Sequence, residues 1–376
     1  MVSLSASISK SPLVEGLSPA DSDRVMQALE FVTPFFEERA ILTEQNALQF
    51  AVGVASTLAM LKTDVDTRIA GLLFELSEIN PLAAEKIEIM FGKEIAGLVA
   101  GVRRLMRLRE ATLIQHDVGR GKDEAERSAS QMEVLRKMVL AMANDMRVVL
   151  VRLASRVTTL RYFAECKRDD GAAQQFASET MDLYAPLANR LGIWQLKWEL
   201  EDLSFRFLEP EQYKRIAKML EEKRVERESF VVSAIARLEH ELTAVGIHAE
   251  VTGRPKHIYS IWKKMRGKKV DFDELYDVRA FRVVVEDTKD CYTVLGILNN
   301  LWTPIPKEFD DYISRPKPNG YKSLHTVVIV DDGRPLEVQI RTKEMHQFSE
   351  FGVAAHWRYK ETGGSNFSAQ EYDEKI

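Results

Sequence analysis

The sequence predicts an α+β protein of more than one domain, in which an all-α first half precedes a mixed β-sheet domain in the last third. Two observations support this prediction. From about Ser18 to Tyr162, apolar residues recur at three- and four-residue intervals without a strand-like segment, which favours helices. After Gly246, short β-branched runs alternate with helical stretches, which is typical of a mixed sheet.

The helical first half opens with a helix start signal. Ser18 can cap a helix whose first residue is Pro19, and acidic residues follow in the first turn. The polar, glycine-containing segment 114–130 interrupts the pattern and is expected to be a loop. The longer stretches with helical apolar spacing lie at residues 45–64, 66–79, 130–163 and 173–241.

In the last third, the expected strands lie at residues 248–253, 278–286, 325–330 and 336–342. The last two are expected to form a hairpin whose turn contains Asp331, Asp332 and Gly333. The expected organisation is therefore a flexible start (1–19), an all-α domain (20–172), linker helices (173–244), a mixed-sheet domain (245–362) and a mobile tail (363–376).

The composition of the 376 residues is ordinary for a globular protein, with 45% hydrophobic and 29% charged residues. Because the net charge is −5, any anion binding has to depend on local basic patches. Cys166 and Cys291 stand far apart, which argues against a disulfide framework and a cysteine zinc site. The sequence has no secretory signal pattern and no run of 18 apolar residues, so we expect a cytoplasmic protein without a membrane partner.

A basic stretch without acids covers residues 252–270. Helical spacing would place Lys256, Ser260 and a lysine at 263 or 264 on one side, with Arg254 at the entry. Such a stripe suits a polyphosphate, because several cations can offset several negative charges. From charge alone, a solvated basic helix is the favoured interpretation of this stretch.

Two acids stand in strand contexts further along. Asp277 opens one expected strand, and Glu337 alternates with Gln339 and Arg341 in another. A carboxylate in a buried strand is usually paired, metal-bound or catalytic. If the two strands are neighbours, Asp277 and Glu337 could hold Mg²⁺ together with substrate phosphates. Two exposed acids on edge strands are the alternative.

The segment between these acids, residues 308–326, contains two X-Pro steps and an Asn-Gly pair, so a structured loop is expected rather than a helix or strand. Within it, Lys317 and Lys322 supply cations, Asn319 an amide, Tyr321 an aromatic ring and His325 an imidazole. Tyr321 could stack on a base, and Asn319 could contact a base edge. From composition alone, the segment could also be a plain surface loop.

Several segments resemble, in order and spacing, the RelA/SpoT-type (p)ppGpp synthetases. The resembling segments are GRPKHIYSIWKKM (253–265), ELYDVRAFRVVV (274–285), EFDDYISRPKPNGYKSLHT (308–326), LEVQIRT (336–342) and EFGVAAHWRYKE (350–361). The resemblance implies a nucleotidyltransferase-like mixed sheet that transfers pyrophosphate from ATP to the 3′-hydroxyl of GDP or GTP, an activity of the stringent response. In this reaction the 3′-hydroxyl attacks the β-phosphorus of ATP and AMP leaves.

The resemblance also implies roles for individual residues. Asp277 would bind Mg²⁺, and Glu337 would act beside it as general base or second metal ligand. Arg254 would stack on adenine and Tyr321 on guanine. The residues implied to bind nucleotides are Arg254, Lys256, Ser260 and Lys264 for ATP, and Lys317, Asn319, Tyr321 and His325 for GDP or GTP.

The loop carries an acidic variant of the family motif at Glu308, Asp310 and Asp311. Bifunctional relatives have basic residues at the first and third positions of this motif. The acidic form resembles the synthesis-only RelA type and implies a preference for GDP; the acids could also recruit a second Mg²⁺. The sequence contains no GxxxxGK[ST] loop, which excludes a P-loop NTPase.

The helical half resembles the HD-type hydrolase domain of bifunctional relatives, which hold Mn²⁺ with His, His-Asp and a distal Asp. Here the His-Asp position reads Phe74-Glu75, the distal Asp is Ser155, and no histidine lies near residues 48–50. We therefore expect an inactive hydrolase domain without Mn²⁺.

Three functions follow as hypotheses. The first is a synthesis-only (p)ppGpp synthetase, and the second is a bifunctional synthetase–hydrolase. The third is a non-catalytic nucleotide- or RNA-binding regulator, which the presence of the synthetase motifs disfavours. Long family members continue into a regulatory half that senses uncharged tRNA on the ribosome, so the 376 residues are expected to be an N-terminal catalytic part, with ribosome and tRNA as partners of the longer protein.

Overall fold

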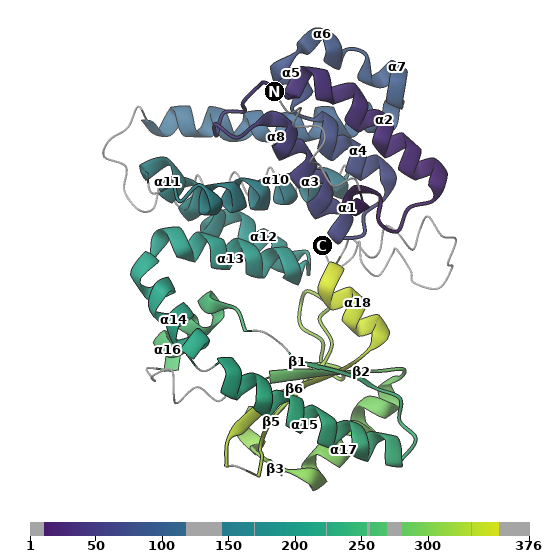
Figure 1. Cartoon of the computed structure of the whole chain (residues 1–376), viewed down its shortest axis with the longest axis vertical. Helices are drawn as coiled ribbons and strands as arrows, with labels where there is room; N and C mark the ends of the chain where they lie inside the picture. The colour runs from purple at the N-terminus through teal and green to yellow at the C-terminus, as the bar shows by residue number, and fades with distance from the viewer. Residues whose placement is uncertain are drawn as a thin grey trace. The chain divides into compact units, whose positions relative to one another are not determined.

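The computed structural model describes residues 11–117, 145–168, 170–222, 224–253, 256–268, 280–331 and 333–352. These residues fall into two compact units, with 11–188 in the first and 189–352 in the second. The colour bar of Figure 1 follows the chain through both. Of the residues with predicted roles, Arg254 and Asp277 lie outside the described ranges.

The first unit is helical, as its apolar spacing predicted. Its elements are α1 (Ser11–Val14), α2 (Pro19–Phe36), α3 (Ala47–Met60), α4 (Val65–Leu73), α5 (Leu76–Ile79), α6 (Pro81–Ala84), α7 (Ile87–Phe91), α8 (Lys93–Asp117), α10 (Met146–Glu165), α11 (Gly171–Glu179), the π-helix η2 (Thr180–Tyr184) and α12 (Ala185–Arg190), which crosses the boundary between the units. Helix α8 includes residues 114–117, which were expected to belong to a loop. The rest of that expected loop lies outside the described residues.

Side-chain caps fix where several of these helices begin. Ser18 accepts a hydrogen bond from Asp21 N, with Pro19 in the first turn, as predicted. Asn46 caps α3, and Asp64 caps α4 through the backbone N–H of Thr67 at 2.8 Å. Each such cap satisfies a backbone donor that the helix leaves unpaired and contributes about 1 kcal/mol.

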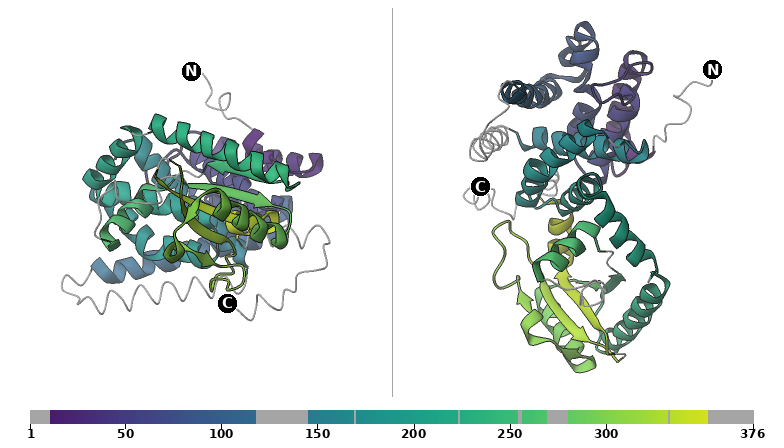
Figure 2. Two further views of the ribbon diagram at one scale, coloured as in Figure 1. Left: turned by 90° about the horizontal axis from the view of Figure 1, so that it is seen from below. Right: turned by 90° about the vertical axis from the view of Figure 1, so that its left-hand side faces the viewer.

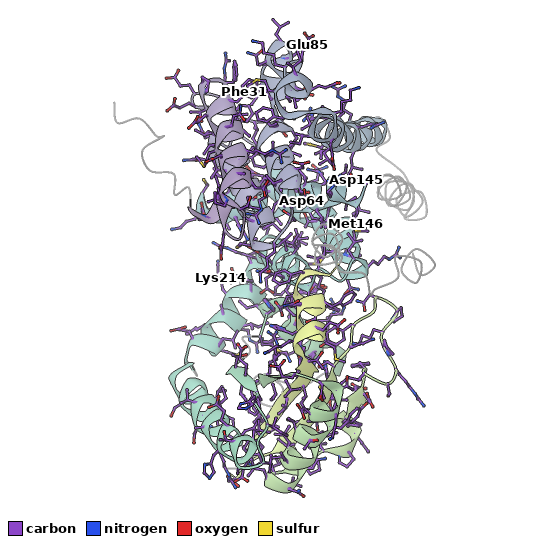
Figure 3. The ribbon with its side chains drawn as sticks, turned by 90° about the vertical axis from the view of Figure 1, so that its right-hand side faces the viewer. Phe31, Asp64, Glu85, Asp145, Met146 and Lys214 are labelled. Carbon is purple, nitrogen blue, oxygen red and sulfur yellow. The ribbon has the colours of Figure 1, made fainter. Side chains whose placement is uncertain are left out.

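Helices α3, α4 and α10 cross closely in the core of the first unit. A Cβ on Gly71 of α4 would come within 2.6 Å of the Leu58 side chain, and one on Gly53 within 2.7 Å of Thr158. The absence of a side chain at Gly53 and Gly71 therefore allows these helices to approach one another closely. The ring of Phe31 on α2, which is labelled in Figure 3, lies 5.7 Å from that of Phe91 on α7.

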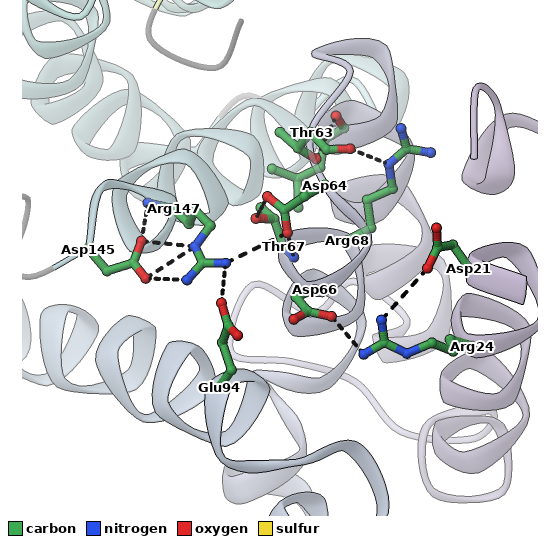
Figure 4. Close-up of polar contacts among 11 residues, drawn as sticks. Asp21, Arg24, Thr63, Asp64, Asp66, Thr67, Arg68, Glu94, Asp145 and Arg147 are labelled. Carbon is green, nitrogen blue, oxygen red and sulfur yellow. Dashed lines mark hydrogen bonds and ion pairs between the residues drawn. The ribbon is translucent and has the colours of Figure 1, made fainter. Parts of the chain in front are cut away.

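A buried ion-pair network joins three helices of this unit (Figure 4). Arg147, at the start of α10, pairs with Glu94 on α8 at 2.8 Å and with Asp145 at 2.7 Å. Its guanidinium also lies 3.8 Å from Asp64, the cap of α4. The side chains of Arg147 and Asp64 are 9% and 4% exposed, so their contact is little screened by water, whereas Glu94 is 61% exposed and its pair with Arg147 is screened.

The second unit combines helices with one sheet, as predicted for the last third. Its elements after α12 are α13 (Trp194–Leu208), α14 (Pro210–Glu222), α15 (Arg224–Ala244), β1 (Glu250–Gly253), α16 (Ile258–Lys268), β2 (Ala280–Val285), α17 (Thr288–Leu301), β3 (Thr303–Pro304), the 3₁₀ helix η4 (Pro306–Glu308), β4 (Asp310–Asp311), β5 (Leu324–Ile329), β6 (Pro335–Thr342) and α18 (Lys343–Phe351).

The strand order is β1-β2-β6-β5-β3, and β4 pairs with β5. Figure 1 labels β1, β2, β3, β5 and β6, and Figure 2 shows the same sheet from two further sides. Strand β6 lies inside the sheet, parallel to β2 and antiparallel to β5. Its Glu337 is in register with Ala280 on one side and Val327 on the other. The predicted hairpin between β5 and β6 is confirmed, with Gly333 at φ +77° in its turn.

The two faces of β6 differ as strand alternation predicted. Val338 and Ile340 are fully buried in an apolar core with residues of α15 and α17. On the other face Glu337, Gln339 and Arg341 form a chain of hydrogen bonds, with Arg341 bonded to Ser349 on α18. Figure 1 shows α15 and α17 on one side of the strands and α18 on the other.

The segment 308–326 is more regular than the sequence suggested. Asp310 and Asp311 form the short strand β4, which pairs with His325 and Leu324 of β5. A strand of two residues is too short to show the period-two pattern by which strands are predicted. The expectation of a loop without helix or strand is therefore wrong at these two positions, at Glu308 in η4 and at Leu324 in β5.

Candidate active site

Glu337 is a buried carboxylate on the polar face of β6, with an exposed fraction of 9%. Its Oε1 accepts a hydrogen bond from Gln339 Nε2 at 3.0 Å, and its Oε2 lies 3.4 Å from Lys256 Nζ. A buried carboxylate keeps its charge only where a cation or donors compensate for lost hydration. Lys256 and Gln339 supply that compensation.

His325 on β5 lies between this carboxylate and an aromatic ring. Its Nδ1 is 4.0 Å from Glu337 Oε1, and its Nε2 is 2.8 Å from the hydroxyl of Tyr321. The two ring nitrogens of a neutral imidazole differ in role, one donating and one accepting. The hydrogen bond to Tyr321 therefore orients the imidazole beside the carboxylate.

Tyr321 belongs to a cluster of rings that also contains a cation. Its ring centroid lies 5.5 Å from that of Trp194 on α13 and 6.2 Å from that of Tyr312. Tyr312 also contacts the His325 ring edge-on at 5.2 Å. Lys317 places its Nζ 4.3 Å from the Tyr312 centroid and 5.5 Å from the Tyr321 centroid, within the range of cation–π attraction.

Burial and two neighbouring charges act on the pKa of Lys317. Burial lowers the pKa of Lys317 below its usual value, Asp310 raises it again, and Lys197 on α13 lowers it further. Asp310 also holds the Tyr312 hydroxyl, and burial together with this hydrogen bond raises the pKa of Tyr312. Asp310 thus acts electrostatically on Lys317 and on Tyr312 within the cluster of aromatic rings.

Asp311, the next residue, has a structural role in its own turn. Its carboxylate accepts hydrogen bonds from the backbone N–H groups of Ile313 and Ser314 at 3.0 and 2.9 Å, and from the Tyr292 hydroxyl at 3.0 Å. Burial alone would raise the pKa of Asp311, but these hydrogen bonds, with that of Ser314 the largest, hold it below its usual range. Glu308 ends the 3₁₀ helix η4 just before.

Asn319 anchors the loop that carries Tyr321. Its Nδ2 donates to the carbonyl of Asn189 at 3.1 Å, and its Oδ1 accepts from Tyr321 N at 3.3 Å. Gly320 follows at φ +77°, where a Cβ would come within 3.0 Å of the Phe348 ring. Both ends of the Asn319 amide therefore hold this turn against the rest of the unit.

Helix α16 carries two of the residues predicted for ATP, Ser260 and the exposed Lys264. Its N-terminus is capped from α13, because Asp202 accepts hydrogen bonds from Tyr259 N at 2.8 Å and Ile258 N at 3.3 Å. The same carboxylate lies 3.2 Å from His257 Nδ1. Asp202 therefore fixes the start of the basic helix.

Comparison with known proteins identifies both halves of the chain. Residues 28–194 match the HD domain family, and residues 253–364 match the family described as the region found in RelA/SpoT proteins. The chain therefore contains an HD domain followed by a RelA/SpoT region. The predicted fold class is confirmed as well, since a helical HD domain precedes a mixed-sheet domain.

The chain is similar to relatives with two different names. It is 45% identical over 325 residues to the GTP pyrophosphokinase of Escherichia coli K12, covering 86% of this chain and 42% of that protein. It is 40% identical over 347 residues to the guanosine-3′,5′-bis(diphosphate) 3′-pyrophosphohydrolase of Aquifex aeolicus, covering 91% of this chain and 47% of that protein. The chain thus spans less than half the length of these relatives.

Among solved structures, the chain is similar to small alarmone synthetase 1 from Bacillus subtilis bound to its product pppGpp. The two are 25% identical, with a TM-score of 0.31, and the match covers 42% of this chain and 88% of that one.

The structure brings together five of the residues that the RelA/SpoT resemblance singled out. They form one connected series in the order Lys256, Glu337, His325, Tyr321 and Lys317. Sequence reasoning did not assign Tyr312, Asp202 or a role for Trp194 in this cluster. Tyr312 lies within the recognised motif 308–326, whereas Asp202 and Trp194 gain their place only through the fold.

The positions compared with the hydrolase ligands lie in the core of the HD domain. Phe74 is fully buried, and its ring centroid lies 5.9 Å from that of Phe50. Glu75 lies 3.4 Å from Arg103, and Ser155 bonds to the backbone and guanidinium of Arg152. A ring and a hydroxyl are poor ligands for Mn²⁺, whereas Glu75 offers a carboxylate that is paired with Arg103.

Within the described ranges, no three His, Cys, Asp or Glu side chains come together as a metal site. Across the same ranges, none of the helices combines the length and apolarity needed to cross a bilayer.

Proposed function

We propose that this chain synthesises (p)ppGpp by transferring the pyrophosphate group of ATP to the 3′-hydroxyl of GDP or GTP. The observation that supports this best is the continuity from Lys256 through Glu337 and His325 to Tyr321. It joins a residue predicted for the ATP phosphates to residues predicted for the guanosine nucleotide, with a buried carboxylate between them. The E. coli relative named GTP pyrophosphokinase supports the same reaction.

Glu337 is proposed as the general base. Its carboxylate would accept the proton of the 3′-hydroxyl while that oxygen attacks the β-phosphorus and the bond to AMP breaks. General-base catalysis of this kind contributes about 10²–10⁴-fold. Gln339 and Lys256 would hold the carboxylate in place, and His325 would keep the acceptor nucleotide beside it.

The nucleotide contacts are proposed on the same basis. Lys256, Ser260 and Lys264 would neutralise the phosphates of ATP, with Arg254 against the adenine. Tyr321 and Lys317 would bind the guanosine nucleotide within the ring cluster. Because two polyanions must be held in line, positioning can supply roughly 7–11 kcal/mol of the barrier reduction.

The side chains of this site are of the chemical type that binds Mg²⁺. The buried Glu337 offers carboxylate oxygens, and Mg²⁺ is commonly held by one or two carboxylates plus substrate phosphates. Glu337 and Asp277 would hold it, although Asp277 lies outside the described residues. When bound, the ion would neutralise charge on the ATP phosphates.

Preference for GDP is proposed to depend on the acidic segment at Glu308, Asp310 and Asp311. Asp310 supports this role because it acts on the charge of Lys317. Asp311 is committed to its own turn by three hydrogen bonds. We therefore expect Asp310 to contribute most to the preference for GDP over GTP.

We also propose that the HD domain does not hydrolyse (p)ppGpp and binds no Mn²⁺. The buried Phe74 and the bonds of Ser155 to Arg152 support this proposal. A bifunctional enzyme is the alternative, favoured by the Aquifex relative named a pyrophosphohydrolase. Mn²⁺-dependent release of pyrophosphate from ppGpp would favour the alternative.

The synthetase proposal is tested by measuring AMP and ppGpp formed from ATP and GDP in the presence of Mg²⁺. Glu337→Gln is expected to lower the rate about 10²–10⁴-fold. Glu286→Gln makes the same chemical change at a glutamate with a 60% exposed side chain and should leave the rate unchanged. Full activity in Glu337→Gln would contradict the base role, and full activity in Asp277→Ala the metal role.

Contact with the ribosome and uncharged tRNA is proposed only for a longer protein that contains the regulatory half of the long family members. A cytoplasmic site of action stays a prediction from the sequence.

A further inference from the structure

Helix α13 carries a stripe of aromatic and charged side chains in the second unit. The stripe has helical spacing of three and four residues and consists of Trp194, Lys197, Trp198 and Glu201. Trp194 lies against Tyr321, with 5.5 Å between the ring centroids. This face of α13 therefore borders the ring cluster of the candidate active site.

Lys197 is a partly buried cation on this stripe, with a 17% exposed side chain. Its Nζ lies 5.5 Å from the centroid of the Trp194 ring, within the range of cation–π attraction. Lys317 approaches the neighbouring Tyr321 ring at the same distance. Two lysines thus converge on two adjoining rings.

The charges of these two lysines act on each other. Burial lowers the pKa of Lys317, Asp310 raises it, and the charge of Lys197 lowers it again. An anion that contacts two cations replaces part of their repulsion by attraction. A phosphate group shared by Lys197 and Lys317 would therefore bind with a gain in free energy.

Glu201 neutralises Lys197 in the structure. Its Oε2 lies 2.7 Å from Lys197 Nζ, one helical turn away. Burial raises the pKa of Glu201 above its usual range, although the charges of Lys197 and Lys263 act in the opposite direction. Because burial penalises the charged form of this carboxyl, an ionised phosphate is a stronger partner for the flexible lysine.

The stereochemistry of GDP fits this arrangement. The ribose carries its 3′-hydroxyl and its 5′-carbon on opposite faces of the sugar ring. With the 3′-hydroxyl at Glu337, the proposed base, the 5′-phosphates point away from that carboxylate. Lys317 ends the series of contacts that starts from Lys256 and Glu337, and Lys197 adds positive charge at that end.

We propose that Lys197 binds the 5′-phosphates of the guanosine nucleotide together with Lys317, and that Glu201 holds the Lys197 ammonium group until the nucleotide arrives. The inference rests on the proposed function, because it concerns the acceptor site of that reaction. The segments 252–270 and 308–326 contain every cation that the sequence predicted for nucleotide binding. Lys197 adds one from outside both.

The test is hydrogen–deuterium exchange of the whole chain, followed by mass spectrometry, during titration with GDP without ATP. Peptides covering residues 312–325 report the guanosine site. Glu201→Gln removes the internal competitor and should lower the GDP concentration that gives half-maximal protection. Adding Lys197→Met to this variant should raise that concentration at least about tenfold, because charge-assisted hydrogen bonds are lost. The double variant leaves no buried charge of this pair without its partner, so its fold should be kept.

Lys214 and Glu211 on α14 provide a matched control. They form the same kind of pair at 3.2 Å, but their side chains are 72% and 84% exposed, and Figure 3 labels Lys214. Glu211→Gln, alone or with Lys214→Met, should leave the GDP titration unchanged. Shifts equal to those of the α13 variants would indicate a general effect of charge and overturn the proposal.

A second nucleotide separates phosphate binding from support of the rings. GMP carries less phosphate charge than GDP, so the loss caused by adding Lys197→Met should be smaller for GMP. Equal losses for the two nucleotides, no loss for GDP, or no protection of 312–325 by GDP would each contradict a phosphate contact at Lys197.

Synthesis of ppGpp is assayed separately, so that the two proposals can fail independently. If the wild type makes ppGpp but Lys197→Met does not change the GDP titration of Glu201→Gln, only the role of Lys197 is overturned. If GDP binding depends on Lys197 in a chain that makes no ppGpp, that role is supported and the proposed function is wrong.

Discussion

The ammonium group of Lys256 lies 3.4 Å from the carboxylate of Glu337, a residue 81 positions further along the chain. Both side chains are about nine-tenths buried. The pair connects the segment before α16 to the central strand β6. It thereby joins the basic stripe, which the sequence predicts to bind ATP, to the acid that we propose as general base.

Breaking this pair is expected to destabilise the second unit. Lys256→Met leaves the Glu337 charge buried without its cation, which costs about 3–5 kcal/mol. The double variant Lys256→Met/Glu337→Gln removes the unpaired charge and should regain much of that loss. Urea unfolding followed by tryptophan fluorescence measures this, since Trp194, Trp198, Trp262 and Trp302 all lie in the second unit. Effects that add within about 0.5 kcal/mol would show that the two side chains are not coupled.

Binding of the guanosine nucleotide should weaken at alkaline pH because Lys317 loses its charge. Its pKa in the folded protein is below the usual 10.5, so the ammonium is present at lower pH and disappears as pH rises through the lowered pKa. The KM for GDP should therefore rise at a pH where an exposed lysine is still charged. Asp310→Asn removes an interaction that raises the pKa of Lys317 and should move this rise to lower pH.

Two controls separate this effect from general alkaline damage. Lys317→Arg keeps its charge at all accessible pH values and should abolish the rise in KM. Asp331→Asn makes the same change at a side chain with 68% exposure and should leave the profile in place. If the pH profile is the same in Asp310→Asn and in the wild type, the proposed coupling is wrong.

Removing the cap of α16 should affect both stability and ATP binding. Asp202→Ala leaves the N–H groups of Ile258 and Tyr259 without their acceptor, a loss of about 1 kcal/mol. Because α16 carries Ser260 and Lys264, the KM for ATP should rise more than the KM for GDP. Asp202→Asn retains an acceptor and should fall between Ala and wild type. Equal changes in both KM values would indicate a general loss of structure.

The ion pairs of Arg147 and those of Arg24, both drawn in Figure 4, should differ in their contribution to stability. Arg147→Met leaves the buried Asp64 without its cation and should cost about 1–3 kcal/mol, less than for a fully buried pair because Glu94 and Asp145 are solvated. Arg24→Met breaks the pair with Asp66, in which the arginine side chain is 44% exposed, and should cost about 0–1 kcal/mol. Circular dichroism during thermal unfolding of each variant gives the comparison. Similar losses of stability in the two variants would mean that the burial of Arg147 does not strengthen its ion pairs.

Patterns within short segments predicted much of the second unit. The β-branched runs marked β2, β5 and β6, and alternation along β6 correctly placed Glu337, Gln339 and Arg341 on one face. The hairpin between β5 and β6 was predicted from the residues of its turn. Each of these features depends on neighbours in the sequence, and such local signals are visible without a fold.

Contacts between distant segments were not predictable in the same way. Asp202 caps a helix that starts 56 residues later, and Trp194 meets Tyr321 from another helix. An aspartate or a tryptophan inside a helical pattern gives no sign of such a partner. The strand β4 was missed because it has two residues, and its place depends on pairing with β5.

The inner position of β6 has a consequence for how this protein is made. β6 is the last strand of the described sheet in the sequence, yet it lies between β2 and β5. Until Thr342 has left the ribosome, both of those neighbours lack a partner on that side, and unpaired strand edges invite aggregation. The addition of β6, late in biosynthesis, thus covers the exposed backbone of β2 and β5 and brings in the carboxylate of Glu337. An incomplete nascent chain therefore has neither the complete sheet nor the proposed base.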